Sequence, residues 1–217
     1  MYNKSDIELK VAEFLLQIKA IKLQPANPFT WASGWKSPIY CDNRITLSHP
    51  SVRTYVRQKL AQLIQEEYGA VDVIAGVATA GIPQGVLVAQ ELGLPFIYVR
   101  SKAKEHGTGS LIEGEVVEGQ RVVVIEDLIS TGKSSLQAVE ALRNAGLSVA
   151  GLVAIFTYGF QQADDNFAAA KCRYSTLSNY KALVDYAAEH AIIAKSDMEF
   201  LNKWRENPAE WGKNETV

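Results

Sequence analysis

From Gly69 onward the chain alternates short apolar runs with stretches of helical periodicity. The apolar runs cover residues 71–77, 95–100, 121–127 and 148–156, and a further strand is expected around Cys172. Helices are expected near residues 83–92, 132–145, 179–189 and 197–206. Runs of valine and isoleucine without polar interruption are typical of parallel strands that are buried on both faces. The pattern therefore predicts an α/β fold with a central, mainly parallel sheet flanked by helices.

The N-terminal part of the chain has a different character. Apolar residues recur at helical spacing over residues 7–18, and a second helix is expected over residues 50–69. Between them, residues 27–44 are rich in turn formers and aromatic residues, and no internal repeat is present. We expect a single domain over residues 1–217. Residues 1–45 would form a small N-terminal hood, with the C-terminal segment supplying further flanking helices.

Composition narrows the classes of function. The net charge of −2 over 217 residues argues against a protein that binds nucleic acid through its overall field. The two cysteines, Cys41 and Cys172, are far apart and have no metal-like spacing, which favours free thiols in a reducing cytoplasm. The polar N-terminus does not resemble a secretory signal, and no apolar run has membrane-spanning length. We expect a cytoplasmic protein without a membrane or nucleic-acid partner.

Ligands of open α/β sheets bind beside the carboxyl ends of the strands. Three of these ends should therefore carry chemistry, namely the loops after Val77, Val99 and Ile125. The third reads "VVVIEDLISTGKSS" over residues 122–135, and its last part resembles the phosphate loop of nucleotide hydrolases. That loop requires a glycine five residues before Gly132, where this chain has Asp127. The hydrolase interpretation is therefore disfavoured.

A sugar phosphate explains the same residues better. Ser130, Thr131 and Ser134 lie with Gly132 at a strand-to-helix turn, where hydroxyls and backbone N–H groups favour a phosphate. Glu126 and Asp127 are acceptors when ionised, and suit the two hydroxyls of a ribose. A ribose 5-phosphate would span both groups. The plainer alternative is an acidic strand end followed by an ordinary helix cap.

These residues resemble the 5-phosphoribosyl-1-diphosphate (PRPP) signature of the type I phosphoribosyltransferases. The resemblance implies that the segment forms the floor of a PRPP site. The implied PRPP-binding residues here are Glu126, Asp127, Leu128, Ile129, Ser130, Thr131, Gly132, Lys133 and Ser134. The role of Lys133 stays open.

The two remaining loops differ in how much they reveal. "GVATAGIP" over residues 76–83 has small residues that let backbone N–H groups approach an anion, although any tight turn can look similar. By resemblance it is the pyrophosphate loop, which often carries a strained non-proline peptide. In the long segment 98–120 four basic residues alternate: Arg100, Lys102, Lys104 and His106. The segment is either a lid over the site or a solvated charged loop.

The lid interpretation gains from a second resemblance. Arg100, Lys104, His106 and Gly107 match the R-x-x-x-K-x-H-G pattern of the orotate branch of the family, and residues 29–40 match its F-T-x-x-S-G-x-K-S-P-x-Y stretch. The resemblance implies that PRPP and orotate are the substrates and that Mg²⁺ is held mainly by PRPP, with no metal site on the protein. It implies a homodimer whose lid reaches the neighbouring subunit. It also implies that four residues are catalytic, namely Arg100, Lys102, Lys104 and His106. Of these, Arg100, Lys104 and His106 would bind PRPP. Ser130 would contact orotate.

The chain departs from some members of that branch at three places. Ala32 and Ala80 stand where those members have lysines, and residues 155–160 lack an arginine that they carry after the fourth strand. The residue that anchors the orotate carboxylate is therefore left open. Two other functions also stay open, namely a phosphoribosyltransferase for a purine base and a regulator that keeps the PRPP fold but binds nucleic acid.

Overall fold

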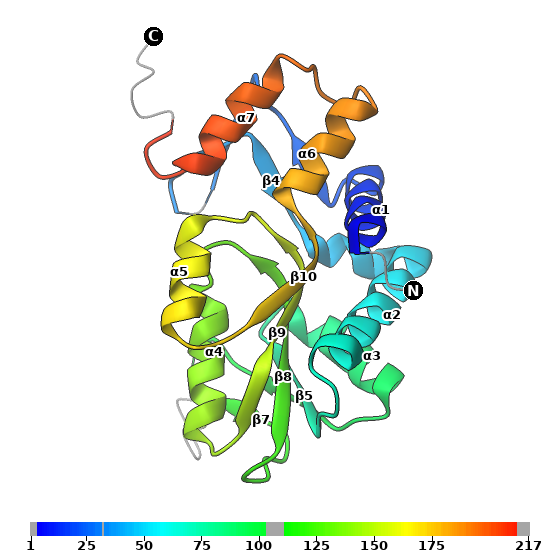
Figure 1. Ribbon diagram of the computed structural model, residues 1–217, viewed down its shortest axis with the longest axis vertical. Coiled ribbons are helices and arrows are strands. Elements are labelled where there is room, and N and C mark those ends of the chain that lie inside the picture. Colours follow the sequence, from blue (N-terminus) through cyan, green and yellow to red (C-terminus); the bar gives the residue numbers. More distant parts are fainter. Residues whose placement is uncertain (1–3, 32, 103–110, 212–217) are drawn as a thin grey trace.

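The computed structural model describes residues 4–31, 33–102 and 111–211, and Figure 1 shows their arrangement. The helices are α1 (Lys4–Gln17), α2 (Pro50–Glu67), α3 (Gly81–Leu92), α4 (Lys133–Asn144), α5 (Gln161–Ala169), α6 (Tyr180–Glu189) and α7 (Asp197–Glu206), with a 3-10 turn at Asn43–Ser48. The strands are β1 (Ile21–Leu23), β2 (Phe29–Thr30), β3 (Lys36–Ser37), β4 (Ile39–Cys41), β5 (Val73–Val77), β6 (Phe96–Val99), β7 (Ile112–Glu113), β8 (Arg121–Ile129), β9 (Ser148–Thr157) and β10 (Tyr174–Asn179).

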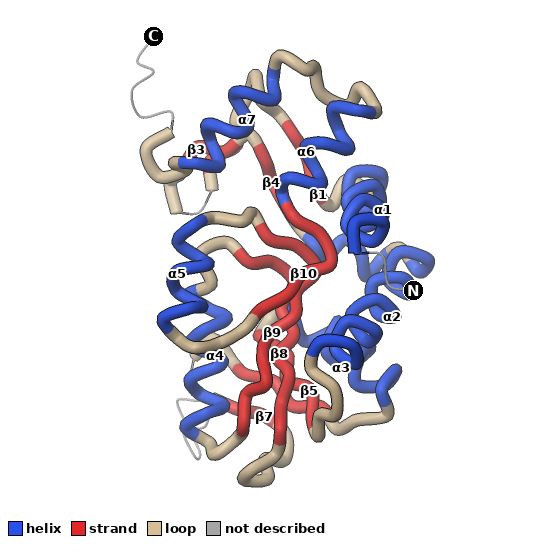
Figure 2. The backbone as a smooth tube through the Cα atoms, viewed as in Figure 1, coloured by secondary structure: helices blue, strands red, loops and turns tan. Residues whose placement is uncertain are grey.

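The central sheet confirms the predicted fold class. Its six strands lie in the order β10-β9-β8-β5-β6-β7, and all neighbours are parallel except the short edge strand β7. In Figure 2, α4 and α5 cover one face of the sheet, and α1, α2 and α3 cover the other. Since both faces are covered, the strands read as continuous apolar runs.

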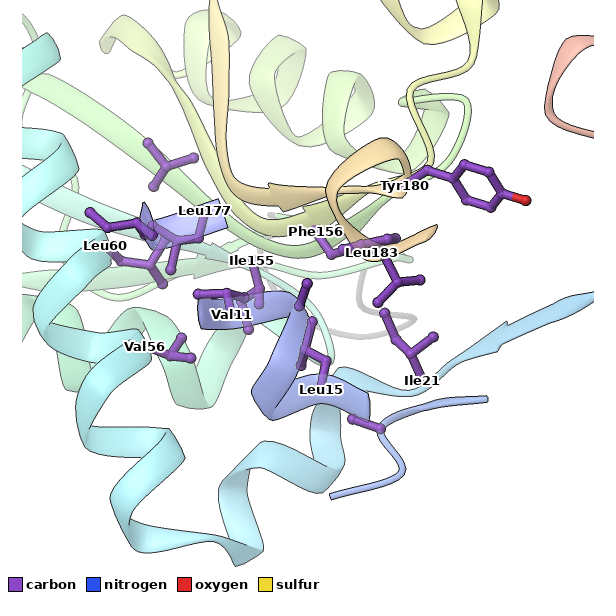
Figure 3. Packing of buried hydrophobic residues seen from close by; sticks show 14 of the residues in the cluster. Val11, Leu15, Ile21, Val56, Leu60, Ile155, Phe156, Leu177, Tyr180 and Leu183 are labelled. Atoms are coloured by element: carbon purple, nitrogen blue, oxygen red, sulfur yellow. The ribbon is translucent and has the colours of Figure 1, made fainter. Parts of the chain in front are cut away.

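Two apolar cores form on the two faces of the sheet, because side chains alternate along each strand. Val123 and Ile125 of β8 belong to the core beneath α1 and α2, whereas Val122 and Val124 belong to the core beneath α4. Figure 3 shows part of the first core, where α1, α2 and the central strands meet.

The strand order reverses between β5 and β8. From β5 the chain proceeds to β6 on one side, and from β8 it proceeds to β9 and β10 on the other. Such a switch point opens a crevice at the carboxyl ends of the two strands, where ligands of this class of sheet bind. The loops after β5 and β8, both selected from the sequence, meet there.

Three details differ from the sequence-based expectations. Strand β8 continues to Ile129, beyond the expected end at Asp127, because its last residues pair with β9. The last strand begins at Tyr174, after Cys172 rather than around it. Helix α5 was not expected, since the helical pattern of residues 161–169 is short and mostly polar.

The hood, residues 1–45, contributes α1 and two antiparallel strand pairs, β1 with β4 and β2 with β3. Helix α7 lies near these strands at the upper end of the molecule in Figure 1. The fully buried Trp204 of α7 joins the two, because its indole N–H donates to the Lys36 carbonyl oxygen at 3.1 Å. None of the helices described is both long and apolar enough to cross a bilayer.

Candidate active site

The acidic pair lies near the carboxyl end of β8. Glu126 is 5% exposed, and its Oε2 accepts a hydrogen bond of 3.1 Å from the Ser135 hydroxyl of α4. Its Oε1 accepts one of 3.0 Å from the backbone N–H of Asp127. The first carboxylate is thus held from the α4 side of the sheet.

Asp127 has its neighbours on the hood side. The Asn43 side chain donates a hydrogen bond of 2.7 Å to the Asp127 carbonyl oxygen, and the Cys41 thiol donates to Asn43 Oδ1 at 3.4 Å. The Arg44 guanidinium favours the charged form of the Asp127 carboxyl, although Arg44 is itself bound to Asp42 at 2.6 Å. The hood therefore reaches the second acid directly.

Negative charge is disfavoured in this part of the protein. Burial, together with the neighbouring Asp127, raises the pKa of Glu126 well above its ordinary value of 4.5. Burial also raises the pKa of Asp127. The pKa of the Cys41 thiol is raised by burial and by Asp127, and burial is the main cause that raises the pKa of Tyr158. A cation or a pair of hydroxyl donors beside the two carboxyl groups would offset the cost of burying them.

The turn from β8 to α4 encloses a cavity of about 310 Å³. Its lining includes Ser130, Thr131, Gly132, Lys133 and Ser134, with Leu128, Ser135 and Gln137 completing it. Gly132 takes a left-handed conformation with φ +77°, and a Cβ there would lie 2.6 Å from Cε2 of Phe167. The turn therefore requires glycine both for its left-handed φ and for lack of space for a Cβ. It also points the amino end of α4 at the cavity, which favours an anion there.

A second cavity of about 320 Å³ adjoins the first, since Ser134 and Gln137 line both. Its other lining residues include Val77 and Ala78 after β5 and Arg100 after β6. The peptide bond between Ala78 and Thr79 is cis, as expected for this loop. Residues after all three strand ends that the sequence singled out therefore line two neighbouring cavities.

Both flanks of the expected lid are fixed at the sheet edge. The backbone N–H of Arg100 donates to the Leu111 carbonyl oxygen at 2.8 Å, and its guanidinium lies 3.4 Å from Glu113 Oε1 of β7. Lys102 is exposed. Lys104 and His106 lie outside the described residues, so only the attachment points of the lid are in view. Those points adjoin the second cavity.

An aromatic cluster connects the hood to the carboxyl end of β9. The Trp31 ring lies 5.1 Å from that of Tyr158 and 5.6 Å from that of Trp204, centroid to centroid. Tyr158 follows β9 directly, and its ring also stacks on Phe160 at 5.4 Å. The cluster therefore packs the hood segment against the end of β9.

Comparison with known proteins fits this geometry. Residues 46–190 match the family described as "Phosphoribosyl transferase domain". The orotate phosphoribosyltransferase of Phocaeicola vulgatus is 59% identical over 205 residues, which cover 94% of this chain and 97% of that protein. The chain belongs to the orotate phosphoribosyltransferases. The same enzyme from Listeria monocytogenes serotype 4b is 55% identical over 95% of this chain and 99% of its own. The crystal structure of orotate phosphoribosyltransferase from Aeropyrum pernix has a TM-score of 0.73 and 28% identity, and covers 85% of this chain and 99% of that one.

For an orotate phosphoribosyltransferase, sequence reasoning found the PRPP motif but missed the groups that support it. Ser134 was selected for its hydroxyl, yet the neighbouring Ser135 is the residue that binds Glu126. Asn43 and Tyr158 were also missed. For Asn43, the only signal in the sequence was its position next to Asp42 in the hood segment. No local signal pointed to the second, because its partners come from residues far apart in the chain.

Proposed function

We propose that this chain transfers the ribose 5-phosphate group of PRPP to the ring nitrogen of orotate, and so serves pyrimidine biosynthesis. The products are orotidine 5′-monophosphate and pyrophosphate. The observation that carries the proposal is the acidic pair of buried Glu126 and half-buried Asp127, beside the glycine turn at the switch point of the sheet. Membership of the orotate phosphoribosyltransferases supports the choice of acceptor.

Each part of PRPP has a complementary group. The hydroxyls and backbone N–H groups of residues 130–134 would bind the 5-phosphate, which the adjoining cavity has room for. Glu126 and Asp127 would accept hydrogen bonds from the ribose hydroxyls. Leu128 and Ile129 would contribute backbone contacts as part of the same motif. Ser130, at the end of β8, would contact orotate.

The lid residues would act on the leaving group. Charge builds on the ribose as the bond to pyrophosphate breaks, so catalysis depends on stabilising pyrophosphate and excluding water. Arg100, Lys102, Lys104 and His106 would close over the second cavity for this purpose. In a homodimer, which we propose as the active form, the lid would serve the neighbouring subunit.

The acidic pair also fits Mg²⁺ as the cofactor. Two neighbouring carboxyl groups with raised pKa values favour a nearby cation, since it would stabilise their ionised forms. Within the described chain no group of three histidine, cysteine or acidic residues could hold a metal ion. We therefore propose that Mg²⁺ arrives with PRPP and neutralises its pyrophosphate, as metal ions do for phosphate oxygens. We also propose that the chain works as a single domain in the cytoplasm.

The test is a direct assay of the acceptor. The purified protein is mixed with PRPP and Mg²⁺, and the loss of orotate absorbance is followed in parallel with the consumption of adenine and hypoxanthine. We expect orotate to be consumed and the purines to be left unchanged. Consumption of a purine without orotate would reject the proposal in favour of a purine enzyme. Glu126→Gln should show little turnover and serves as the control for a contaminating activity.

A further inference from the structure

The carboxylate of orotate requires a positive partner in the site. Several cations lie near the carboxyl ends of β8 and β9, but most are already bound within the protein. Arg44 pairs with Asp42 at 2.6 Å, and Arg100 pairs with Glu113 at 3.4 Å. Lys36 donates to the Thr30 hydroxyl at 2.9 Å and is exposed. Lys133 lines the cavity at the turn from β8 to α4, so the cation to consider beside the turn after β9 is Arg205 of α7.

Arg205 lies against the turn that follows β9. Its Nη1 donates a long hydrogen bond of 3.4 Å to the Gly159 carbonyl oxygen. A Cβ added to Gly159 would also lie 3.4 Å from the same nitrogen, so the guanidinium rests on the glycine backbone itself. Among the residues that the structure describes, no carboxylate forms an ion pair with Arg205. It is half-buried.

Hydrogen bonds join this turn to the end of β8. The Tyr158 N–H donates to the Ile129 carbonyl oxygen at 3.1 Å, and the Gly159 N–H donates to the Thr157 hydroxyl at 3.0 Å. Ile129 is the last residue of β8 and precedes Ser130 of the PRPP motif. A group above Gly159 therefore lies beside the strand end from which Ser130 and the phosphate turn begin.

The tertiary structure fixes Arg205 through its neighbour Trp204. The buried Trp204 ring contacts Tyr158 and Phe160 at centroid distances of 5.8 and 5.4 Å, and its N–H binds the Lys36 carbonyl oxygen. Successive helical side chains are about 100° apart around the axis. Because Trp204 is fixed in the aromatic cluster, the orientation of α7 is fixed as well, and the Arg205 side chain reaches Gly159 in the turn after β9.

We propose that Arg205 binds the carboxylate of orotate and thereby gives the site its preference for orotate over uracil, the same ring without that group. The inference rests on the proposed transfer to orotate. A guanidinium has five N–H donors in a planar fork, of which the Gly159 carbonyl occupies one. The fork matches a carboxylate with two parallel hydrogen bonds. Arg205 would be a specificity-determining residue supplied by the C-terminal helix.

The test compares Arg205→Gln with two matched variants. Lys203→Gln removes a charge from the same helix at an exposed position paired with Glu199, and Lys36→Gln removes the competing cation. For each protein the KM of orotate, the KM of PRPP and the inhibition constant of uracil are measured. In Arg205→Gln we expect the KM of orotate to rise roughly 10- to 100-fold, as for the loss of a charged hydrogen bond. The other two constants should change less than about twofold, and Lys203→Gln should match the wild type.

Three outcomes would overturn the proposal. The first is a KM of orotate in Arg205→Gln equal to that of Lys203→Gln. The second is a rise confined to Lys36→Gln, which would assign the carboxylate to Lys36. The third is a joint rise of all three constants in Arg205→Gln, which indicates a purely structural role in the turn. If Arg205→Gln does not fold, Arg205→Lys keeps the charge without the fork, and its ratio of orotate to uracil affinity must still fall. A wild-type protein that does not consume orotate would instead reject the proposed function.

Discussion

The side-chain amide of Asn43 donates a hydrogen bond of 2.7 Å to the main-chain carbonyl of Asp127. Asn43 is only 1% exposed, and its own Oδ1 accepts from the Cys41 thiol. The contact joins the hood to the strand that carries the acidic pair, across 84 positions of sequence. One buried amide therefore helps to fix the hood against the strand that carries the two acids.

Replacing Asn43 by Ala should weaken both the fold and the site. The Asp127 carbonyl would be left without this partner, which costs about 1–3 kcal/mol of the free energy of unfolding. For a chain of this size each kcal/mol corresponds to a fall in Tm of about 2–4 °C. Thermal melting and the KM of PRPP measure the two effects. The exposed Asn202→Ala on α7 is the control, and equal Tm values for the two variants would contradict the expectation.

Glu126→Gln should raise the free energy of unfolding, by an amount that depends on pH, and should lower activity. Because the pKa of Glu126 is raised in the folded protein, the folded chain holds that proton more tightly than the unfolded chain does. As pH rises above the ordinary value of 4.5, the wild type therefore loses stability, a loss that ends only above the raised folded pKa. The glutamine side chain of the variant does not titrate. The variant should gain free energy of unfolding relative to the wild type as pH rises above 4.5, while its KM of PRPP rises about tenfold or more.

The exposed Glu199 offers a control of opposite sign. Its bond to Lys203 lowers its pKa, so that contribution is present above the ordinary value of 4.5 and is lost as pH falls. Glu199→Gln should thus show a small trend with pH in the other direction and normal activity. Urea unfolding of both variants without ligand is the measurement. A stability difference for Glu126→Gln that stays constant with pH would disprove the assignment.

Gly132→Ala tests the packing of the phosphate turn, and Gly93→Ala is its matched partner. Both glycines are left-handed, with φ +77° and +68°, which costs alanine roughly 1–2 kcal/mol. Only Gly132 has a neighbour in the way, since no atom lies within 4 Å of a Cβ at Gly93. The clash with Phe167 should add about 1–3 kcal/mol to the loss at Gly132. Equal losses in chemical denaturation would show that the clash is absent.

A double variant identifies the source of that added loss. Phe167→Leu removes the ring atom that a Cβ at Gly132 would meet. In the presence of Phe167→Leu, the further cost of Gly132→Ala should fall toward that of Gly93→Ala, which a double-mutant cycle measures. Additive losses would point to backbone strain alone.

Lys104→Ala tests the lid. If Lys104 neutralises the departing pyrophosphate, its loss should lower kcat by about 10²-fold, as for other groups that stabilise transition-state charge. The Tm should stay close to that of the wild type. Lys195→Ala removes an exposed lysine elsewhere and should leave kcat unchanged. Unchanged turnover in Lys104→Ala would remove it from the catalytic set.

The residue pattern was sufficient to predict the layers of the fold. Valine and isoleucine runs such as residues 122–125 are typical of strands buried on both faces, and the helices between such strands must then cover the sheet. The PRPP motif was equally readable, because its acids, hydroxyls and glycine lie within one short segment, residues 126–134. The function could be predicted from this segment because the residues that point to it are neighbours in the sequence.

The sequence alone therefore determined the sheet, the strand ends that carry polar and charged residues, and the class of ligand. Only the tertiary structure decided that Ser135 and Asn43 hold the two acids, that β8 continues through them to Ile129, and that Trp204 brings Arg205 to Gly159. Those relationships join residues up to 168 positions apart, as Trp204 and Lys36 are. Local periodicity carries no information about such pairs, since they are set by how the hood and the last helix pack against the strand ends.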